Sequence, residues 1–301
     1  KTVVFAQSDG EPTNDLTNPY QIVTGHLKMP AGRDWGSVSA IDIDPDGKSV
    51  WIAERCSSDS IRGGYPVRGC AESDLPVILK FNSSGDMVRS FGSGIFAVPH
   101  GFHVDHDGNI WVTDAPFNLP PGVEGKGHVV VKFSPLGDRL MTLGTPGVPG
   151  NGQNHFNMPS DVHVAPNGDI FVADGHGGDS NGRIVKFDSQ GNYLMEWGRP
   201  GSGPGEFDTP HGLAMDSQGR LFVADRTNNR IQIFDQEGNF LDSWEQFSRN
   251  SGIYIDANDM LYAVDSESND NNGHGDWRRG IRVGSARTGE VHFFIPDPFD
   301  A

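Results

Sequence analysis

The sequence has 301 residues, only 35% of them hydrophobic, with 40 glycines and 20 prolines. This composition favours many short strands joined by turns over packed helices. The formal charge of −17 excludes the basic face that nucleic-acid binding requires, and no run of 18 apolar residues could span a membrane. We therefore expect no nucleic-acid partner and no membrane span.

The first 37 residues contain no clear repeat. The chain opens at Lys1 and shows no signal peptide, which indicates a processed mature form or a trimmed chain. Tyr20–Thr24 could form a strand. We expect residues 1–37 to act as an N-terminal closing segment.

Five later segments share the pattern of a strand, a tight turn and a second strand; they begin at Ser39, His100, Ser160, His211 and Ser251. Their apolar residues alternate, which is typical of half-buried strands. Pairs such as Asp46-Gly47 lie between the strands and favour hairpin turns. A second hairpin follows in each copy, beginning at Val77, Val129, Arg183, Arg230 and, less regularly, Arg278.

Two hairpins per repeat make one four-stranded propeller blade. The sequence therefore predicts an all-β fold, a single β-propeller domain over residues 1–301, with blades starting near residues 38, 98, 158, 209 and 249. A full sixth blade needs about 40 residues. We expect a six-bladed propeller in which five repeats are clear, with one blade incomplete or a C-terminal piece missing after Ala301.

The two cysteines, Cys56 and Cys70, lie in one glycine-rich insertion of the first repeat. They could be free thiols, but a disulfide is favoured because the insertion has little else to stabilise it. Their spacing is unlike a zinc motif. A disulfide indicates an exported protein, periplasmic or secreted.

Two histidines occupy the same position of the repeat, just before its first strand. His100 and His211 both stand in Pro-His-Gly triplets. The first strand of a blade is the innermost one, so we expect both side chains at one mouth of the channel. Two imidazoles in register favour a metal or substrate site over isolated structural histidines, and they suit zinc, copper or nickel better than calcium or magnesium.

A second set of equivalent positions follows the next strand, where every copy has an acid: Glu54, Asp114, Asp174, Asp225 and Asp265. We interpret this acid as structural, because a short acceptor can cap the turn. The residues after it vary, and we expect those with polar side chains to line the same mouth: Arg55, His176, Arg226 and Glu267. The arginines suit a carboxylate or phosphate ligand, or else they pair with acids of a neighbouring blade.

These residues resemble the NHL-repeat propellers and, within them, the peptidyl-α-hydroxyglycine α-amidating lyases. The similarity covers roughly residues 36–265 and is sharpest in VPHGFHVDHDGNIWVTD, FVADGH and TPHGLAMDSQGRLFVADRTNNRIQIF. It implies an enzyme that splits a C-terminal α-hydroxyglycine into a peptide amide and glyoxylate. It also implies a catalytic zinc bound by three histidines and a structural calcium.

The resemblance implies His100 and His211 as two zinc ligands, and Arg55 and Arg226 as active-site arginines. Three positions depart from the family pattern. The third zinc histidine is replaced by Ser251, the calcium-binding aspartate by Gly252 and the catalytic tyrosine by His176. His176 could therefore supply the missing ligand or the missing base, while Ser251 and Glu267 are additional candidates.

We expect a metal-dependent carbon–nitrogen lyase that acts as a monomer on a peptide C-terminus or small molecule carrying a carboxylate. One alternative is another propeller enzyme, such as a lactonase or hydrolase, at the same mouth. The other alternative is a non-catalytic NHL-type binding module. The paired histidines favour an enzyme, whereas the missing third histidine favours a different reaction; the fold alone does not choose.

Overall fold

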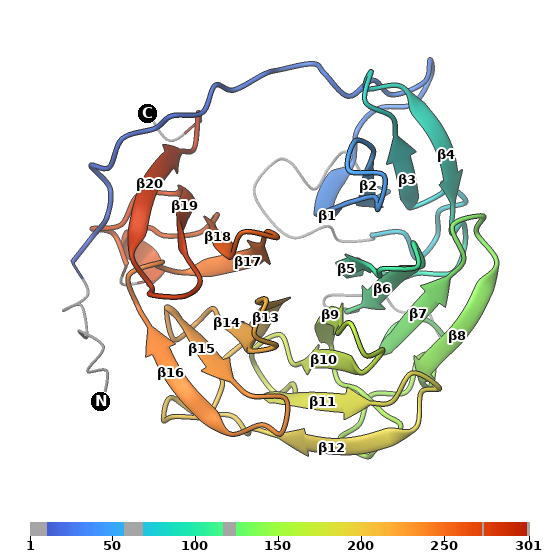
Figure 1. The fold of residues 1–301 in the computed structure, drawn as a ribbon. Helices are drawn as coiled ribbons and strands as arrows, with labels where there is room; N and C mark the ends of the chain where they lie inside the picture. The colour runs from blue at the N-terminus through green and yellow to red at the C-terminus, as the bar shows by residue number, and fades with distance from the viewer. Residues whose placement is uncertain (1–10, 57–68, 117–124, 273, 300–301) are drawn as a thin grey trace. The chain divides into compact units, whose positions relative to one another are not determined.

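The computed structural model describes residues 11–56, 69–116, 125–272 and 274–299. Its regular structure there is twenty β-strands and one short 3-10 helix, η2 (Asp270–Asn272), so the fold is all-β. The strands form five four-stranded sheets, each built from four strands that follow one another in the chain (Figure 1). These sheets are the blades of a β-propeller, and they divide between two compact units, Val23–Met195 and Lys1–Ile22 with Glu196–Ala301.

The Val23–Met195 unit holds the first three blades. The first consists of β1 (Ser37–Ile43), β2 (Val50–Arg55), β3 (Ile78–Phe81) and β4 (Met87–Phe91). The second consists of β5 (Pro99–Val104), β6 (Ile110–Asp114), β7 (Val129–Phe133) and β8 (Arg139–Gly144). The third consists of β9 (Pro159–Val164), β10 (Ile170–Asp174), β11 (Arg183–Phe187) and β12 (Tyr193–Trp197), the last of which crosses the unit boundary. The first strands of these blades, β1, β5 and β9, contact one another in turn.

The second unit holds the fourth and fifth blades. The fourth consists of β13 (Pro210–Met215), β14 (Leu221–Asp225), β15 (Arg230–Phe234) and β16 (Phe240–Trp244). The fifth consists of β17 (Asn250–Ile255), β18 (Met260–Asp265), β19 (Gly280–Ser285) and β20 (Val291–Pro296). Here too the first strands, β13 and β17, contact each other.

The expectation of six blades is wrong, because the described residues form five. Tyr20–Thr24 forms no strand, and residues 11–36 contribute only an isolated bridge between Lys28 and Asp86. The fifth blade has its four strands from one continuous stretch of chain and borrows none from the N-terminus. Instead, the N-terminal segment supplies side chains: Thr13 and Asn14 both accept hydrogen bonds from Arg282 in β19.

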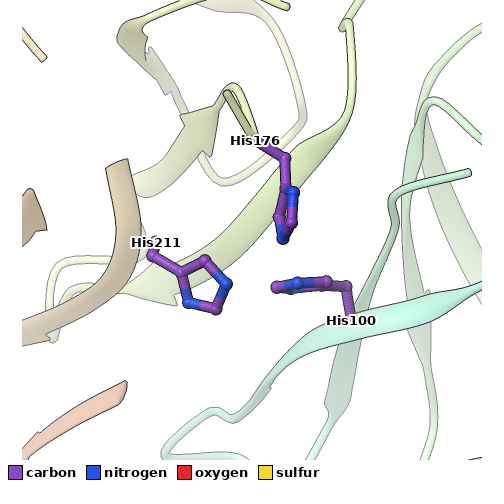
Figure 2. Close-up of side chains that lie close together, drawn as sticks. All are labelled: His100, His176 and His211. Carbon is purple, nitrogen blue, oxygen red and sulfur yellow. The ribbon is translucent and has the colours of Figure 1, made fainter. Parts of the chain in front are cut away.

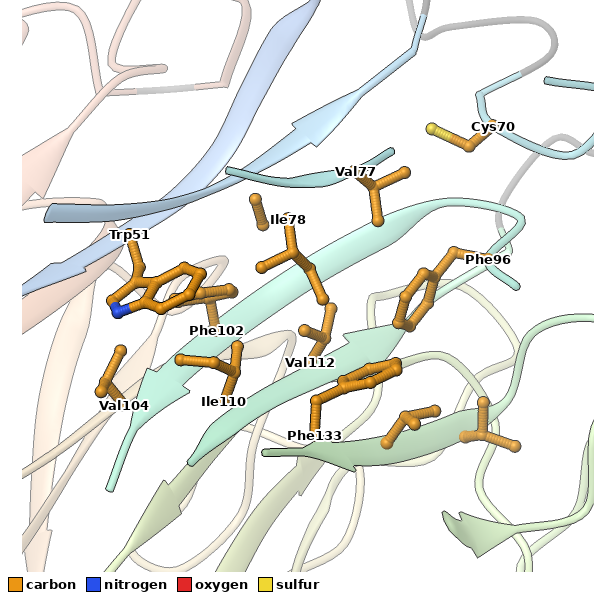
Figure 3. Close-up of a cluster of buried hydrophobic side chains, with 13 residues drawn as sticks. Trp51, Cys70, Val77, Ile78, Phe96, Phe102, Val104, Ile110, Val112 and Phe133 are labelled. Carbon is orange, nitrogen blue, oxygen red and sulfur yellow. The ribbon is translucent and has the colours of Figure 1, made fainter. Parts of the chain in front are cut away.

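The blades pack through apolar faces that the alternation of the strands produces. Between the first and second blades, Trp51 and Ile78 lie against Val112 and Phe133, all of them buried (Figure 3). The hairpin turns hold glycine at positive φ, for example Gly47 at +66° and Gly108 at +80°. A side chain would be strained there, so the turn glycines fix the register of each hairpin.

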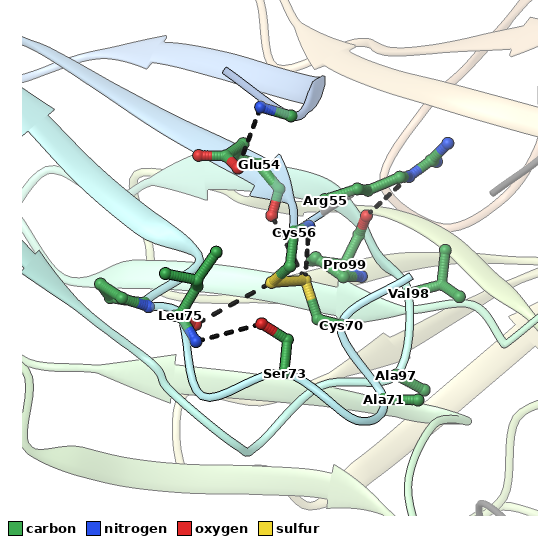
Figure 4. The surroundings of a disulfide bond; sticks show 12 residues. Glu54, Arg55, Cys56, Cys70, Ala71, Ser73, Leu75, Ala97, Val98 and Pro99 are labelled. Carbon is green, nitrogen blue, oxygen red and sulfur yellow. Dashed lines mark hydrogen bonds between the residues drawn. A yellow bond between two sulfur atoms is a disulfide. The ribbon is translucent and has the colours of Figure 1, made fainter. Parts of the chain in front are cut away.

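The predicted disulfide between Cys56 and Cys70 is confirmed (Figure 4). Cys56 follows β2 directly, and its amide donates a hydrogen bond to Cys70 Sγ at 2.9 Å. Cys70 is in turn anchored to the second blade by its own amide, which donates to the Ala97 carbonyl at 2.7 Å. The disulfide is compatible with an exported protein. Among the described residues, no helix has the length and hydrophobicity needed to cross a bilayer.

Candidate functional site

The position that carries His100 and His211 is a β-bulge in every blade. Pairing between the first two strands shifts register there: Pro99 pairs with Asp114 and Phe102 with Val112, so that two residues oppose one. The same shift occurs at the equivalent residues Ser39, Ser160, His211 and Ser251. A bulge re-aims its side chain and is common beside active sites. The repeat thus gives each blade one position whose side chain departs from the strand alternation.

The two bulge histidines make the same hydrogen bond to the next blade. His100 Nδ1 lies 2.7 Å from the Ser160 carbonyl, and His211 Nδ1 lies 2.6 Å from the Ser251 carbonyl. A carbonyl only accepts, so each Nδ1 carries the hydrogen and each Nε2 carries a lone pair. This second bond fixes the tautomer and orientation that a metal-ligating histidine needs.

His176 belongs to the loop after β10 and approaches His100, with the two ring centroids 4.8 Å apart and the rings nearly perpendicular. Its backbone amide donates to Ser180 Oγ at 2.7 Å, which holds the turn that carries it. His100 and His176 belong to the Val23–Met195 unit and His211 to the other unit, and each of the three offers a ring nitrogen that could be a metal ligand (Figure 2). His100 is buried, while the other two rings are partly exposed.

The repeated acid at the end of each second strand holds the loop that leads into the bulge. Asp114 accepts the amides of Ala97 and Val98 at 2.8 and 2.6 Å, immediately before Pro99 and His100. In the fourth blade Asp225 accepts the Asp208 amide at 2.7 Å. Both carboxylates are fully buried. The structural interpretation of these acids agrees with this geometry, because each one satisfies amides of its own blade.

Burial gives Asp114 an unusual acidity. Desolvation raises its pKa to about 6, against the hydrogen bonds from Ala97 and Val98, which favour the charged form. The folded state therefore holds this proton more tightly than the unfolded chain, and the contribution of Asp114 to stability falls as the pH rises through this range.

Asp114→Asn removes this titration. We expect the stability difference between wild type and variant to be about 2 kcal/mol larger near pH 4.5 than near pH 7, as about 1.4 kcal/mol per pKa unit implies. Urea denaturation at the two pH values measures it. A difference that is equal at both, or larger at neutral pH, would contradict the raised pKa.

Arg226 lies directly against His211. Its Nη1 is 3.0 Å from His211 Nε2 and 3.3 Å from Glu267 Oε1. Glu267 also pairs with Arg249, whose Nη2 is 3.2 Å from Oε2. Arg226 is 9% exposed, so its guanidinium is largely shielded from water. The structure thus brings His211, Arg226 and Glu267 together, and it adds Arg249.

The remaining candidates, Arg55 and Ser251, each make a hydrogen bond, and Gly252 offers no side chain. Arg55 Nε donates to the carbonyl of Pro99 at 3.3 Å, next to His100, and Arg55 directly precedes the disulfide residue Cys56 (Figure 4). Ser251 shares a hydrogen bond with Ser266, with 2.7 Å between the two hydroxyl oxygens. Gly252 has no side-chain oxygen, so the position that the resemblance assigns to calcium offers no carboxylate.

Arg249 is a site residue that the sequence analysis missed. It stands two residues before Ser251, where the equivalent residue of the fourth blade is Thr209. The available signal was the neighbouring Asn250, which replaces the proline found at the start of three of the other four bulges, at 99, 159 and 210. The loop into the fifth blade was therefore already marked as atypical.

The chain is similar in sequence to several known proteins. The NHL repeat family model matches residues 207–234. The chain is 36% identical over 210 residues to peptidyl-glycine alpha-amidating monooxygenase of Mus musculus, covering 64% of this chain and 20% of that protein. It is 39% identical over 145 residues to a probable peptidyl-alpha-hydroxyglycine alpha-amidating lyase of Caenorhabditis elegans, covering 47% of this chain and 38% of that protein.

The chain thus contains a match to the NHL repeat and is similar to amidating lyases. The chain spans well under half the length of these curated relatives. Among solved structures, virginiamycin B lyase from Staphylococcus aureus is similar, with a TM-score of 0.55 at 18% identity over 89% of this chain and 72% of that chain. That likeness shows the fold alone.

Proposed function

We propose that the protein is a metal-dependent lyase that cleaves the C-terminal α-hydroxyglycine of a peptide into an amide and glyoxylate. The observation that carries the proposal is the shared geometry of His100 and His211. Both use Nδ1 to bond a backbone carbonyl and so keep Nε2 as a lone-pair donor. The named lyase relatives support the choice of reaction.

The donor set fits a divalent transition metal. Three imidazole nitrogens are ligands that zinc accepts in catalytic sites, where a fourth position stays open to substrate. We propose His176 as the third ligand, in place of the histidine that Ser251 replaces. The perpendicular approach of its ring to His100 supports this role. When bound, zinc would supply Lewis acidity that lowers the pKa of the substrate hydroxyl.

The residues around this group position the substrate. Arg226 and Arg55 would bind its carboxylate, for which a guanidinium provides paired donors. The reaction needs no oxidant and no water: the hydroxyl loses its proton, the carbon–nitrogen bond breaks as the carbonyl of glyoxylate forms, and the leaving amide nitrogen takes up a proton. The protein's task is therefore to hold the carboxylate and to bring a single proton from oxygen to nitrogen.

The test is glyoxylate release from a peptidyl-α-hydroxyglycine by protein stripped with a chelator and then reloaded. We expect about one transition-metal ion per chain as purified, loss of activity on stripping and recovery with zinc. Full activity of the stripped protein would refute the metal requirement. Metal-loaded protein that releases no glyoxylate would refute the lyase assignment.

His176→Ala separates the two roles that this residue could have. If His176 is a ligand, as we propose, the variant loses metal affinity together with activity. If His176 is instead the base, the variant keeps its metal and loses turnover. Metal content measured beside glyoxylate release distinguishes the two results, and His106→Ala, a change at an exposed turn histidine, is the control.

A further inference from the structure

The lone pair on Nε2 of His211, in the fourth blade, could bind either Arg226 or a metal ion. His211 Nδ1 carries its hydrogen because it bonds the Ser251 carbonyl, so Nε2 can only accept. Arg226 Nη1 lies 3.0 Å from this nitrogen and donates to it. A metal ion bound to His211 Nε2 would need the same lone pair.

This arrangement is specific to one blade. His100 makes the equivalent bond through Nδ1, but the residue that corresponds to Arg226 in its repeat is Ala115, which has no side-chain donor. In the third blade the corresponding residue is Gly175. The first blade has an arginine at this position, Arg55, but its bulge residue is Ser39, so only the fourth blade combines a bulge histidine with an arginine there.

A second acceptor for Arg226 is already in place. The same Nη1 lies 3.3 Å from Glu267 Oε1, and Arg249 holds the other oxygen of that carboxylate. Arg249 also donates to the backbone carbonyl of Arg226 at 3.1 Å, which fixes the two arginines next to each other. The guanidinium could thus leave His211 and stay paired with Glu267.

We propose that Arg226 and the metal ion compete for Nε2 of His211, and that a carboxylate ligand raises metal affinity by drawing Arg226 away. This inference rests on the proposed function only for the presence of the metal. A bound carboxylate offers the guanidinium a charged acceptor, which is stronger than a neutral imidazole. Because linked binding is reciprocal, the metal also raises the affinity for the carboxylate.

The test measures zinc affinity by competition with a chromophoric chelator. We expect Arg226→Gln to bind zinc about tenfold more tightly than wild type, the effect of one hydrogen bond from a charged donor. Arg249→Gln is the matched control, since it removes an equal charge from the same carboxylate without removing the donor to His211. We expect its zinc affinity to change less than about threefold.

A second experiment adds acetate as a simple carboxylate ligand. Adding it should tighten zinc binding by wild type more than by Arg226→Gln, because only wild type has a guanidinium to withdraw. Glu267→Gln should weaken zinc binding, since Arg226 then has only a neutral acceptor besides His211; thermal unfolding of each variant checks that it is folded. This second variant tests the same competition if Arg226→Gln does not fold.

Equal zinc affinities for Arg226→Gln and wild type would overturn the inference. So would equal gains in Arg226→Gln and Arg249→Gln, because the effect would then be local charge alone. These readouts involve no turnover. The competition therefore stands if zinc binds as expected but no glyoxylate is released, and it falls together with the metal site if zinc does not bind.

Discussion

Replacing His100 with alanine is expected to lower metal affinity by more than about a hundredfold and glyoxylate release by about a thousandfold. Loss of a residue that only orients a ligand already costs about 10- to 100-fold in affinity, and loss of the ligand itself costs more. The bulge that presents His100 is a backbone feature shared by all five blades, so alanine should leave the sheet intact. Elemental analysis and a glyoxylate assay measure the two effects.

His211→Ala should behave in the same way, and His106→Ala provides the control for both. His106 lies in the turn of the same hairpin as His100, and its side chain is 60% exposed. Metal content that is unchanged in both bulge variants would contradict the metal site. A fall in metal content in the His106 variant would show that the loss is not specific to the bulge.

Arg282→Ala is expected to lower the free energy of unfolding by about 3–5 kcal/mol, the usual effect of breaking a buried ion pair from one side. Arg282 is fully buried, and its guanidinium lies between the rings of Trp277 and Phe294, 4.7 and 4.6 Å from their centroids. Asp265, also buried, is 3.8 Å away. Burial lowers the pKa of Arg282 to about 10, while Asp265 opposes the shift, so the arginine stays charged at neutral pH.

Arg287→Ala is the matched control, because it removes an arginine of the same blade whose side chain is 63% exposed. Its partner Asp259 is buried but keeps two hydrogen bonds from Ser217, so we expect the loss of this half-exposed pair to cost less than about 1 kcal/mol. Urea denaturation of both variants compares them. Equal destabilisation by the two substitutions would contradict the claim that burial makes Arg282 important. Because Asp265 is followed at once by Ser266 and Glu267, we also expect Arg282→Ala to disturb the contacts of Glu267.

The sequence predicts the blades well and their number poorly, for one physical reason. Hairpin turns need positive φ, so a turn glycine such as Gly47 marks four of the five repeats directly, and Asp259 takes the positive φ in the fifth. Residues 1–37 carry no such repeat, and we expected them to add a strand such as Tyr20–Thr24 that would help to close the ring. In the structure this segment uses side chains such as Asn14 to contact an existing blade, which no strand pattern can indicate.

Part of the candidate site could be predicted from the sequence and part of it could not. That His100 and His211 are equivalent could be read from the repeat, and the bulge explains why that position differs from the alternation around it. The contact between Arg226 and His211 could not be predicted, because it depends on the rotamer of a long side chain. Arg249 was missed because it lies before the strand, in a loop whose path the pattern does not fix.

The buried acids have a consequence for how this protein can change. Each one holds the entry loop of its own blade, as Asp114 does for the loop before His100 and Asp225 for the loop before His211. The loop before each bulge is therefore held by its own blade, whichever residue the bulge presents. The loss of a histidine at Ser251 and the gain of one at His176 would then be two independent substitutions. Neither residue holds the loops of the fold, so the fold would tolerate each change. In such a protein the residues of the candidate site can change one loop at a time.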